Sequence, residues 1–281
     1  MDLAYWGFRR WPFDRKGLAR PLFLGAVHEE ALARLLFLVE ERRRCGMVTG
    51  ATGTGKSCLL REVRRQAERL GRLCIEVDAT GMDGHELSAR IAEGAFGECD
   101  VNGTPSRSWS SLQRRFEALA IVRQPLVVLV DHFDLVEFAC SQTLRRLMHL
   151  ADTTGVELTV LIAARERFTA PLLLDAVELS VELTPWTPEE TSRFVSDSLK
   201  WAGTQQAIFD EDALEAIHSL THGVPADVVW LCDLALLAAM SEGRRRIDIE
   251  VIEAAAAELA PRDWLMHDRM PLASYPSRSR Q

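Results

Sequence analysis

Short apolar runs alternate with amphipathic segments along residues 1–185 of the chain. Five of the runs have the length of strands: 47–49, 73–77, 126–130, 158–163 and 177–183. Three segments between them repeat apolar residues at helical spacing: 59–70, 110–122 and 136–151. This alternation predicts an α/β fold, in which helices cover both faces of a five-stranded parallel sheet in a three-layer αβα arrangement.

The pattern changes at Trp186, and from there the sequence predicts helices without strands. Thr187-Pro188-Glu189-Glu190 is typical of a helix start, because Thr caps the helix, Pro suits its first position and Glu190 closes a capping box. The helices are predicted at 188–201, 211–220, 225–240 and 249–259. The expected domains are therefore an α/β core with an N-terminal leader over 1–185, a small helical lid over 186–259 and a loose tail over 260–281.

A glycine-rich motif follows the first predicted strand. It consists of Gly50, Ala51, Thr52, Gly53, Thr54, Gly55, Lys56 and Ser57, and it fits the phosphate-loop pattern G-x-x-x-x-G-K-[ST]. Glycines let backbone N–H groups point at phosphate oxygens, and the helix that begins there adds the positive end of its dipole. We expect Lys56 to bridge the β- and γ-phosphates and Ser57 to bind Mg²⁺. Cys58 is grouped with these nucleotide-binding residues, as a small buried side chain rather than a nucleophile.

A phosphate loop needs a carboxylate at the end of a neighbouring strand to help hold Mg²⁺. The apolar run 126–130 ends in Asp131, which is therefore the expected second metal ligand, the Walker B aspartate. ATPases with this arrangement usually have Glu at the next position, where this chain has His132. Either His132 or Asp134 is a candidate for positioning the attacking water. In the other interpretation no strong base remains and hydrolysis is slow, since loss of a general base costs about 10²–10⁴-fold in rate.

Several segments resemble AAA+ ATPases of the general secretion pathway protein A type. The segments that carry the likeness are Tyr5-Trp6-Gly7-Phe8, Pro12-Phe13, His28-Glu29-Glu30-Ala31-Leu32, the phosphate loop, Gly223-Val224-Pro225 and Leu231-Cys232-Asp233. The resemblance covers about residues 5–259. It implies ATP as the nucleotide with Mg²⁺, bound between core and lid and often between subunits, with Pro225 among the binding residues. It also implies lid movement, a protein partner and a homo-oligomer.

The chain departs from the family pattern at three catalytic positions. Ala226 stands where the family has an arginine after Gly-x-Pro, and His132 replaces the catalytic Glu. The arginine expected just before the last core strand has no counterpart in residues 174–177, and Arg165 or Arg167 is the candidate substitute. An arginine finger contributes about 10³–10⁵ in rate. Family members in secretion carry a membrane span and a wall-binding part after the ATPase region; we expect neither here, and therefore do not expect a secretion role to carry over.

Composition and charge narrow the possible binding partners and cellular locations of the protein. The chain has 281 residues, 47% hydrophobic and 26% charged, with a net charge of −8. This charge disfavours a nucleic-acid binder, although two arginine triplets, at 42–44 and 244–246, leave a local basic patch open. Six scattered cysteines without Cys-x-x-Cys pairs favour reduced thiols and a cytoplasmic location. No apolar run reaches the roughly 18 residues of a membrane helix.

Three functions follow from these observations. The first is a hydrolysing ATPase that acts on a protein partner, and the second is a nucleotide-dependent switch without appreciable turnover. The third is a DNA-transaction helper similar to the transposition ATPases. The leader aromatics are expected to pack on adenine or against the core, two roles that are compatible, and they are Trp6, Phe8, Trp11 and Phe13.

Overall fold

The computed structural model describes residues 2–13, 22–96, 105–136, 138–165, 172–173 and 175–258. The chain divides into two compact units. The α/β unit comprises Pro21–Pro185, and the helical unit comprises Met1–Arg20 together with Trp186–Gln281. The expected tail, 260–281, lies outside the described residues.

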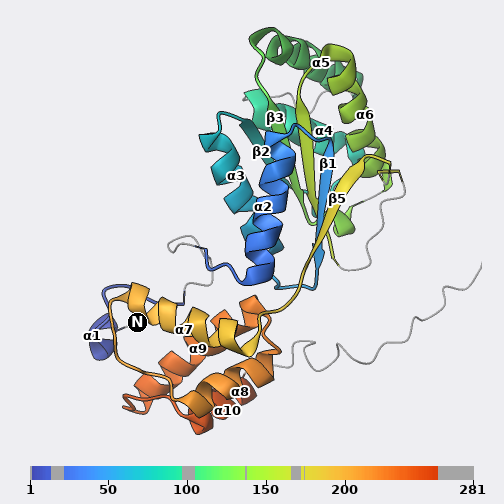
Figure 1. Ribbon diagram of the computed structural model, residues 1–281. Helices are drawn as coiled ribbons and strands as arrows, with labels where there is room; N and C mark the ends of the chain where they lie inside the picture. The colour runs from blue at the N-terminus through green and yellow to red at the C-terminus, as the bar shows by residue number, and fades with distance from the viewer. Residues whose placement is uncertain are drawn as a thin grey trace, which may run out of the picture. The chain divides into compact units, whose positions relative to one another are not determined.

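A parallel sheet forms the centre of the α/β unit (Figure 1). The strands in the described part are β1 (Cys45–Gly50), β2 (Leu73–Asp78), β3 (Leu126–Asp131), β4 (Leu158–Ala163) and β5 (Val177–Leu183). Their order is β2-β3-β4-β1-β5, with parallel pairing throughout. All the runs predicted as strands are strands, and their ends differ from the prediction by two residues at most.

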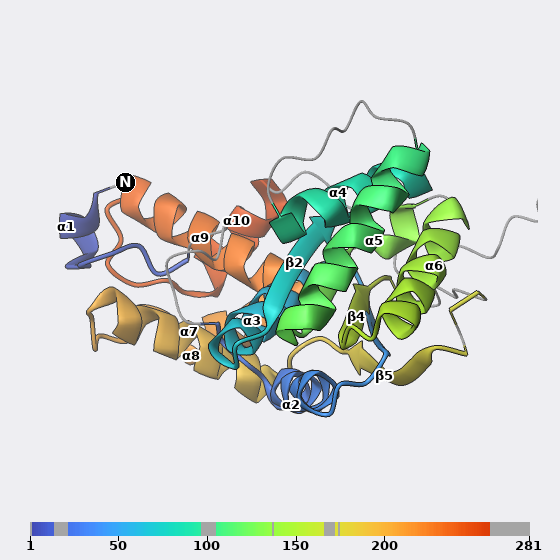
Figure 2. The same ribbon diagram turned by 90° about the horizontal axis from the view of Figure 1, so that it is seen from above.

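Both faces of the sheet are buried. On β3, Val128 and Val130 pack into one apolar cluster while Val127 and Leu129 pack into another, as the alternation of a strand requires. The second cluster includes α2 (Ala26–Glu40) and α3 (Lys56–Arg69). The first cluster includes α4 (Gly84–Phe96), α5 (Pro105–Val122) and α6 (Phe138–Thr154), which Figure 2 shows on the opposite side. The predicted three-layer αβα fold is confirmed.

Three helical segments differ from the prediction. Helix α4 was not expected, and α5 begins five residues earlier than 110–122 indicated. The helix predicted at 136–151 is α6, with ends shifted by two and three residues, and a short 3₁₀ helix η1 (Phe133–Leu135) precedes it. The chain is extended at Val136, with φ −105° and ψ 162°, and this residue separates the two.

The helical unit contains α1 (Leu3–Trp6), α7 (Pro188–Ala202), α8 (Glu211–Thr221), α9 (Pro225–Ser241) and α10 (Ile249–Glu258). The capping box predicted at the start of α7 is present. The Thr187 hydroxyl accepts from the Glu190 N–H at 3.3 Å, and the Glu190 carboxylate accepts from the Thr187 N–H at 3.0 Å. One feature differs from the expected helices without strands, since Phe209 and Ile247 form an isolated parallel bridge.

The N-terminal segment packs within the helical unit, and not with the core as the expected domain 1–185 has it. The Arg9 N–H donates to the Ala202 carbonyl at 2.8 Å, and the Tyr5 hydroxyl donates to the Arg244 carbonyl at 2.8 Å. Among its aromatic side chains, Trp6, Phe8 and Phe13 are buried. The phenyl ring of Phe13 contacts those of Phe194 and Phe209. Apolar burial on the helices therefore decides the position of this segment. Packing within the helical unit replaces the expected packing against the core, and the role on adenine stays a prediction.

Candidate functional site

The carboxyl ends of the strands bring most of the predicted site residues to one edge of the sheet. The phosphate loop follows β1, Asp131 ends β3, and Arg165 comes two residues after β4. Strand β4 lies between β3 and β1, so Arg165 follows the strand that separates Asp131 from the loop. Asp78 ends β2 and pairs in register with Asp131. In open α/β sheets, this edge is where ligands bind.

The phosphate loop has a backbone that its glycines make possible. Gly50 has φ +151°, and a Cβ atom there would lie 2.6 Å from the Leu183 carbonyl oxygen and 2.9 Å from Thr54 Oγ1. Gly53 and Gly55 have φ values of +87° and +100°. Within the loop, the Thr54 hydroxyl donates to the Ala51 carbonyl at 2.8 Å. Thr52 is exposed, whereas Thr54 is completely buried.

Helix α3 begins directly at the loop, with Gly55 as its N-cap and Lys56 as its first residue. Lys56 Nζ donates to the carbonyl oxygens of Gly50 and Ala51 at 2.7 and 2.8 Å, so its ammonium lies over the loop. Ser57 is half-buried in the first turn. Cys58 is also half-buried, and its sulfur accepts from Arg61 Nη2 at 3.1 Å. The positive end of the helix dipole, the ammonium and a hydroxyl are thus concentrated at one helix terminus.

Asp131 is nearly buried at the end of β3, with 7% of its surface exposed. Its Oδ1 accepts the His132 N–H at 2.8 Å. His132 has a left-handed backbone, with φ 54° and ψ 37°, which is uncommon for a residue other than glycine. This turn bends the chain sharply after the strand and places the two side chains 3.9 Å apart, measured from His132 Nδ1 to Asp131 Oδ2.

The His132 ring pairs with Asp78, which the sequence did not single out. Nδ1 lies 3.0 Å from Asp78 Oδ1. Burial opposes ionisation of Asp78, but hydrogen bonds from Thr80 and His132 outweigh it and hold the pKa of this carboxyl below its ordinary value. An ionised carboxylate accepts a hydrogen bond from Nδ1–H, which leaves Nε2 of a neutral imidazole as an acceptor. A base oriented by a carboxylate in this way is able to take a proton from water.

Asp134 is engaged elsewhere. Its Oδ1 accepts the Arg165 backbone N–H at 3.1 Å, and its Oδ2 lies 3.0 Å from Arg165 Nε. The Asp134 carboxylate is 10% exposed, whereas the Arg165 side chain is 58% exposed. This pair ties the end of β3 to the end of β4, so Asp134 holds Arg165 rather than standing open to a water molecule.

The remaining predicted site residues are not among those that the described structure places at the carboxyl edge of the sheet. Pro225 is the first residue of α9 in the helical unit, followed by Ala226, and its role stays a prediction from the resemblance. Arg167 lies outside the described residues. Sequence reasoning missed a further contact of the loop, that of His28 with Thr54. The sequence signal that could have indicated this contact is the position of His28 on the same helical face as the buried apolar residues of α2.

The donor set fits a nucleotide with Mg²⁺. Mg²⁺ prefers hard oxygen ligands and usually takes one or two from protein, with phosphate and water supplying the rest. The hydroxyl of Ser57 and the carboxylate of Asp131 are of this kind. Within the described ranges no group of three or more His, Cys, Asp or Glu side chains is placed to hold a metal ion by itself.

The comparisons with known proteins agree with this geometry. Residues 39–169, which include the loop, Asp131, His132 and Arg165, match the family described as AAA domain. The chain is similar to that family over this region. It is 27% identical to general secretion pathway protein A of Aeromonas hydrophila over 277 residues, which are 92% of this chain. The expected resemblance to ATPases of that type is therefore confirmed. The chain spans about half of that relative, 49% of its length.

Solved structures share the fold of this chain. Cdc6p of Pyrobaculum aerophilum has a TM-score of 0.70 at 16% identity, over 88% of this chain and 71% of that one. The structure of Drosophila ORC bound to DNA has a TM-score of 0.67 at 18% identity, over 90% and 66%. RuvB of Thermotoga maritima, a Holliday junction branch migration motor, scores 0.55 at 14% identity, over 84% and 70%.

The arginine triplets do not form open basic patches. Arg42, Arg43 and Arg44 pair with Glu157, Glu178 and Asp152 at 2.6, 3.4 and 2.6 Å. In the second triplet, Arg244 and Arg246 also pair with carboxylates, and the Arg245 guanidinium lies over the Tyr5 ring. No helix in the described part is long and apolar enough to cross a membrane.

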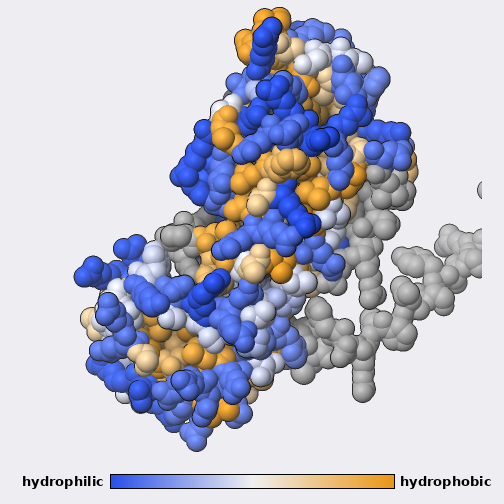
Figure 3. All heavy atoms as spheres, viewed as in Figure 1, coloured by the Kyte–Doolittle hydropathy of each residue, from blue (hydrophilic) through white to orange (hydrophobic). Residues whose placement is uncertain are grey.

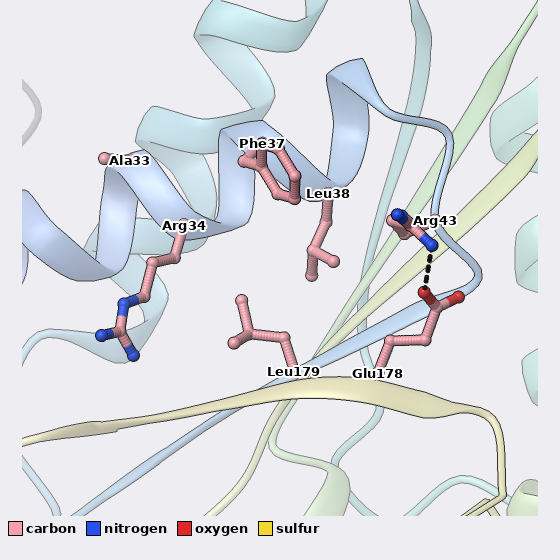
Figure 4. Close-up of a pocket in the computed structure, with 7 residues that line it drawn as sticks. All are labelled: Ala33, Arg34, Phe37, Leu38, Arg43, Glu178 and Leu179. Carbon is pink, nitrogen blue, oxygen red and sulfur yellow. Dashed lines mark hydrogen bonds and ion pairs between the residues drawn. The ribbon is translucent and has the colours of Figure 1, made fainter.

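A groove lies between α2 and β5, near the start of β5 and therefore at the opposite end of that strand from the carboxyl edge (Figure 4). Its lining comprises Ala33, Arg34, Phe37, Leu38, Arg43, Glu178 and Leu179. Leu38 and Leu179 point toward one another, and the Arg43–Glu178 ion pair closes one end. On the face that carries α2, Figure 3 shows apolar atoms between polar ones, and Phe37 is 54% exposed.

Proposed function

We propose that this chain is an AAA+ ATPase that binds Mg·ATP at the phosphate loop and Asp131 and hydrolyses it with His132 in place of glutamate. The observation that carries the proposal is the Asp78–His132 pair beside Asp131, at 3.0 Å. Lys56 and the loop N–H groups bind the phosphates, and Ser57 and Asp131 hold the metal, which neutralises charge that develops on the phosphates. His132 Nε2 accepts the proton of the attacking water.

Turnover is weak in this proposal. Ala226 contributes no charge at the position where the family has an arginine. Arg165, which follows β4 by two residues, supplies a positive charge at that end of the sheet, but it is paired with Asp134. Nucleotide state is coupled to movement of the helical unit and to binding of a protein partner or a second copy of the chain. The scattered cysteines support a reducing compartment, so we place the protein in the cytoplasm.

The experiment measures ATP affinity and steady-state hydrolysis together for wild type, Lys56→Ala and His132→Glu. Lys200→Ala is the matched control, because that lysine is exposed and pairs only locally with Asp197. We expect wild type to bind and slowly hydrolyse ATP, Lys56→Ala to lose binding, and His132→Glu to accelerate turnover. Absence of ATP binding by the folded wild type overturns the proposal.

A non-hydrolysing switch is the second candidate, favoured by the loss of glutamate and of the lid arginine. It requires that wild type binds ATP with no turnover above Lys56→Ala, and that His132→Glu creates turnover. A DNA-transaction helper is the third, favoured by the likeness to ORC solved with DNA. The paired arginine triplets weigh against it. Salt-sensitive retention of DNA, with affinity falling steeply as salt rises, is the result that would favour it.

A further inference from the structure

A histidine of α2 is hydrogen-bonded to the backbone of the phosphate loop. His28 is 5% exposed and lies on the buried face of α2, in line with Ala31, Leu32 and Leu35. Its Nε2 lies 2.7 Å from the Thr54 carbonyl oxygen, and Thr54 is completely buried. A carbonyl only accepts, so Nε2 carries the proton and donates to it.

We propose that His28 is a positioning residue for phosphate binding, acting through the peptide bond between Thr54 and Gly55. This inference rests on the proposed function, because it concerns the same nucleotide site.

Peptide geometry gives the reason. In a trans peptide, the carbonyl of one residue and the N–H of the next point in opposite directions, and no cis peptide occurs in the described part of the chain. By binding the Thr54 carbonyl, His28 fixes the Gly55 N–H on the side away from α2. A phosphate loop binds anions through such N–H groups, and each one that turns away removes a donor. His28 therefore keeps the loop ready for the anion without touching it.

The backbone conformation of Gly55 and the burial of Thr54 both favour the hydrogen bond between His28 and Thr54. Gly55 is the N-cap of α3 with φ +100°, and a Cβ there would lie 3.4 Å from His28 Nε2. The ring thus occupies the space beside Gly55 that a side chain at this position would face. Burial makes the bond costly to lose, because the Thr54 carbonyl would then lie in an apolar environment without its donor.

Two substitutions separate the hydrogen bond from the packing. His28→Leu keeps an apolar side chain in the helix but removes the donor. His28→Gln restores a donor, since the glutamine Nε2 extends about as far as the imidazole Nε2. The control is Val39→Ala, on the same face of α2 but near its other end, which is 2% exposed. Thermal unfolding of each variant identifies those that fold.

The measurement is the affinity for ATP, ADP and inorganic tripolyphosphate, by titration of a fluorescent nucleotide and by competition. We expect His28→Leu to weaken binding of all three by about fivefold to tenfold, the effect of one lost hydrogen bond. His28→Gln regains most of that loss. Val39→Ala lowers the melting temperature and leaves the affinities unchanged. A loss equal for tripolyphosphate and ATP places the effect on the phosphates.

Two results overturn the inference while leaving the proposed function standing. One is wild-type affinity in folded His28→Leu, and the other is an equal loss in His28→Leu and His28→Gln, which would show that ring packing matters rather than the donor. If His28→Leu does not fold, His28→Asn, whose amide is too short to reach Thr54, takes its place with the same criteria. Failure of wild type to bind any of the three ligands overturns the proposed function itself.

Discussion

Replacing Trp11 by Phe should lower the free energy of unfolding of the helical unit by about 1.5–3 kcal/mol, the contribution of a hydrogen bond to a charged group. Trp11 Nε1 donates to Asp233 Oδ1 at 2.5 Å, and Asp233 is a carboxylate of α9 that is only 9% exposed. Phenylalanine keeps a ring that packs edge-on against Phe8, as the indole does at 6.1 Å between centroids. The main loss is therefore the N–H donor.

A double-mutant cycle isolates this bond. Urea unfolding followed by circular dichroism is measured for wild type, Trp11→Phe, Asp233→Ala and the double variant, and we expect a coupling energy of at least about 1.5 kcal/mol. Trp201→Phe is the matched control, since Trp201 is also half-buried and its ring contacts the Arg10 guanidinium at 4.7 Å. A coupling energy below about 0.5 kcal/mol, or equal effects of the two Trp→Phe changes, would refute the reasoning.

Three further predictions concern backbone strain, pH and turnover. Gly223→Ala should destabilise the helical unit by about 2–4 kcal/mol in thermal unfolding, because φ is +71° and the new Cβ would lie 2.1 Å from a carbonyl oxygen. Gly243→Ala, with the same φ but nothing within 4 Å, should cost about 1–2 kcal/mol. Burial lowers the pKa of His218 below its ordinary value of 6.5. The contribution of the neutral ring to stability is therefore complete above that pH and falls as pH drops through the folded pKa. His218→Gln should make the melting temperature depend less on pH between pH 7.5 and 5.5. Asp78→Asn should slow ATP turnover about tenfold and leave ATP affinity unchanged, because it removes the negative charge of the group that pairs with His132.

The fold was predictable because the buried strands are strongly apolar. Strand β3 is apolar over five residues and buried at every position, so its pattern alone identifies it. Helix α4 was missed because Gly84 and Gly94 dilute its helical signal. Its position is decided by tertiary contacts, since a Cβ on Gly84 would lie 2.8 Å from the Ala139 carbonyl oxygen of α6. No local pattern contains that constraint.

The site divides in the same way. The phosphate loop and Asp131 are local motifs, and the sequence identified them by spacing. The partners His28 and Asp78 come from other segments, and only strand register and helix packing bring them to the loop and to His132. Asp134 was a plausible candidate for positioning water in the sequence, because nothing there shows that the end of β4 supplies its partner.

The arrangement at the end of β3 bears on whether His132 takes over the role of the catalytic glutamate or leaves the site without a base. An Asp–Glu sequence supplies two carboxylates beside the metal and the attacking water. Here Asp131 supplies one, and strand register brings Asp78 beside it as the second, with the His132 ring between them at 3.9 and 3.0 Å. In the proposed function, the imidazole takes the place of the carboxylate that contacts water. Asp78 then acts through His132, and Asp78→Asn should slow wild type but have little effect on His132→Glu, which carries its own carboxylate. Equal slowing in both backgrounds would mean that Asp78 contributes charge alone and that His132 is not the base.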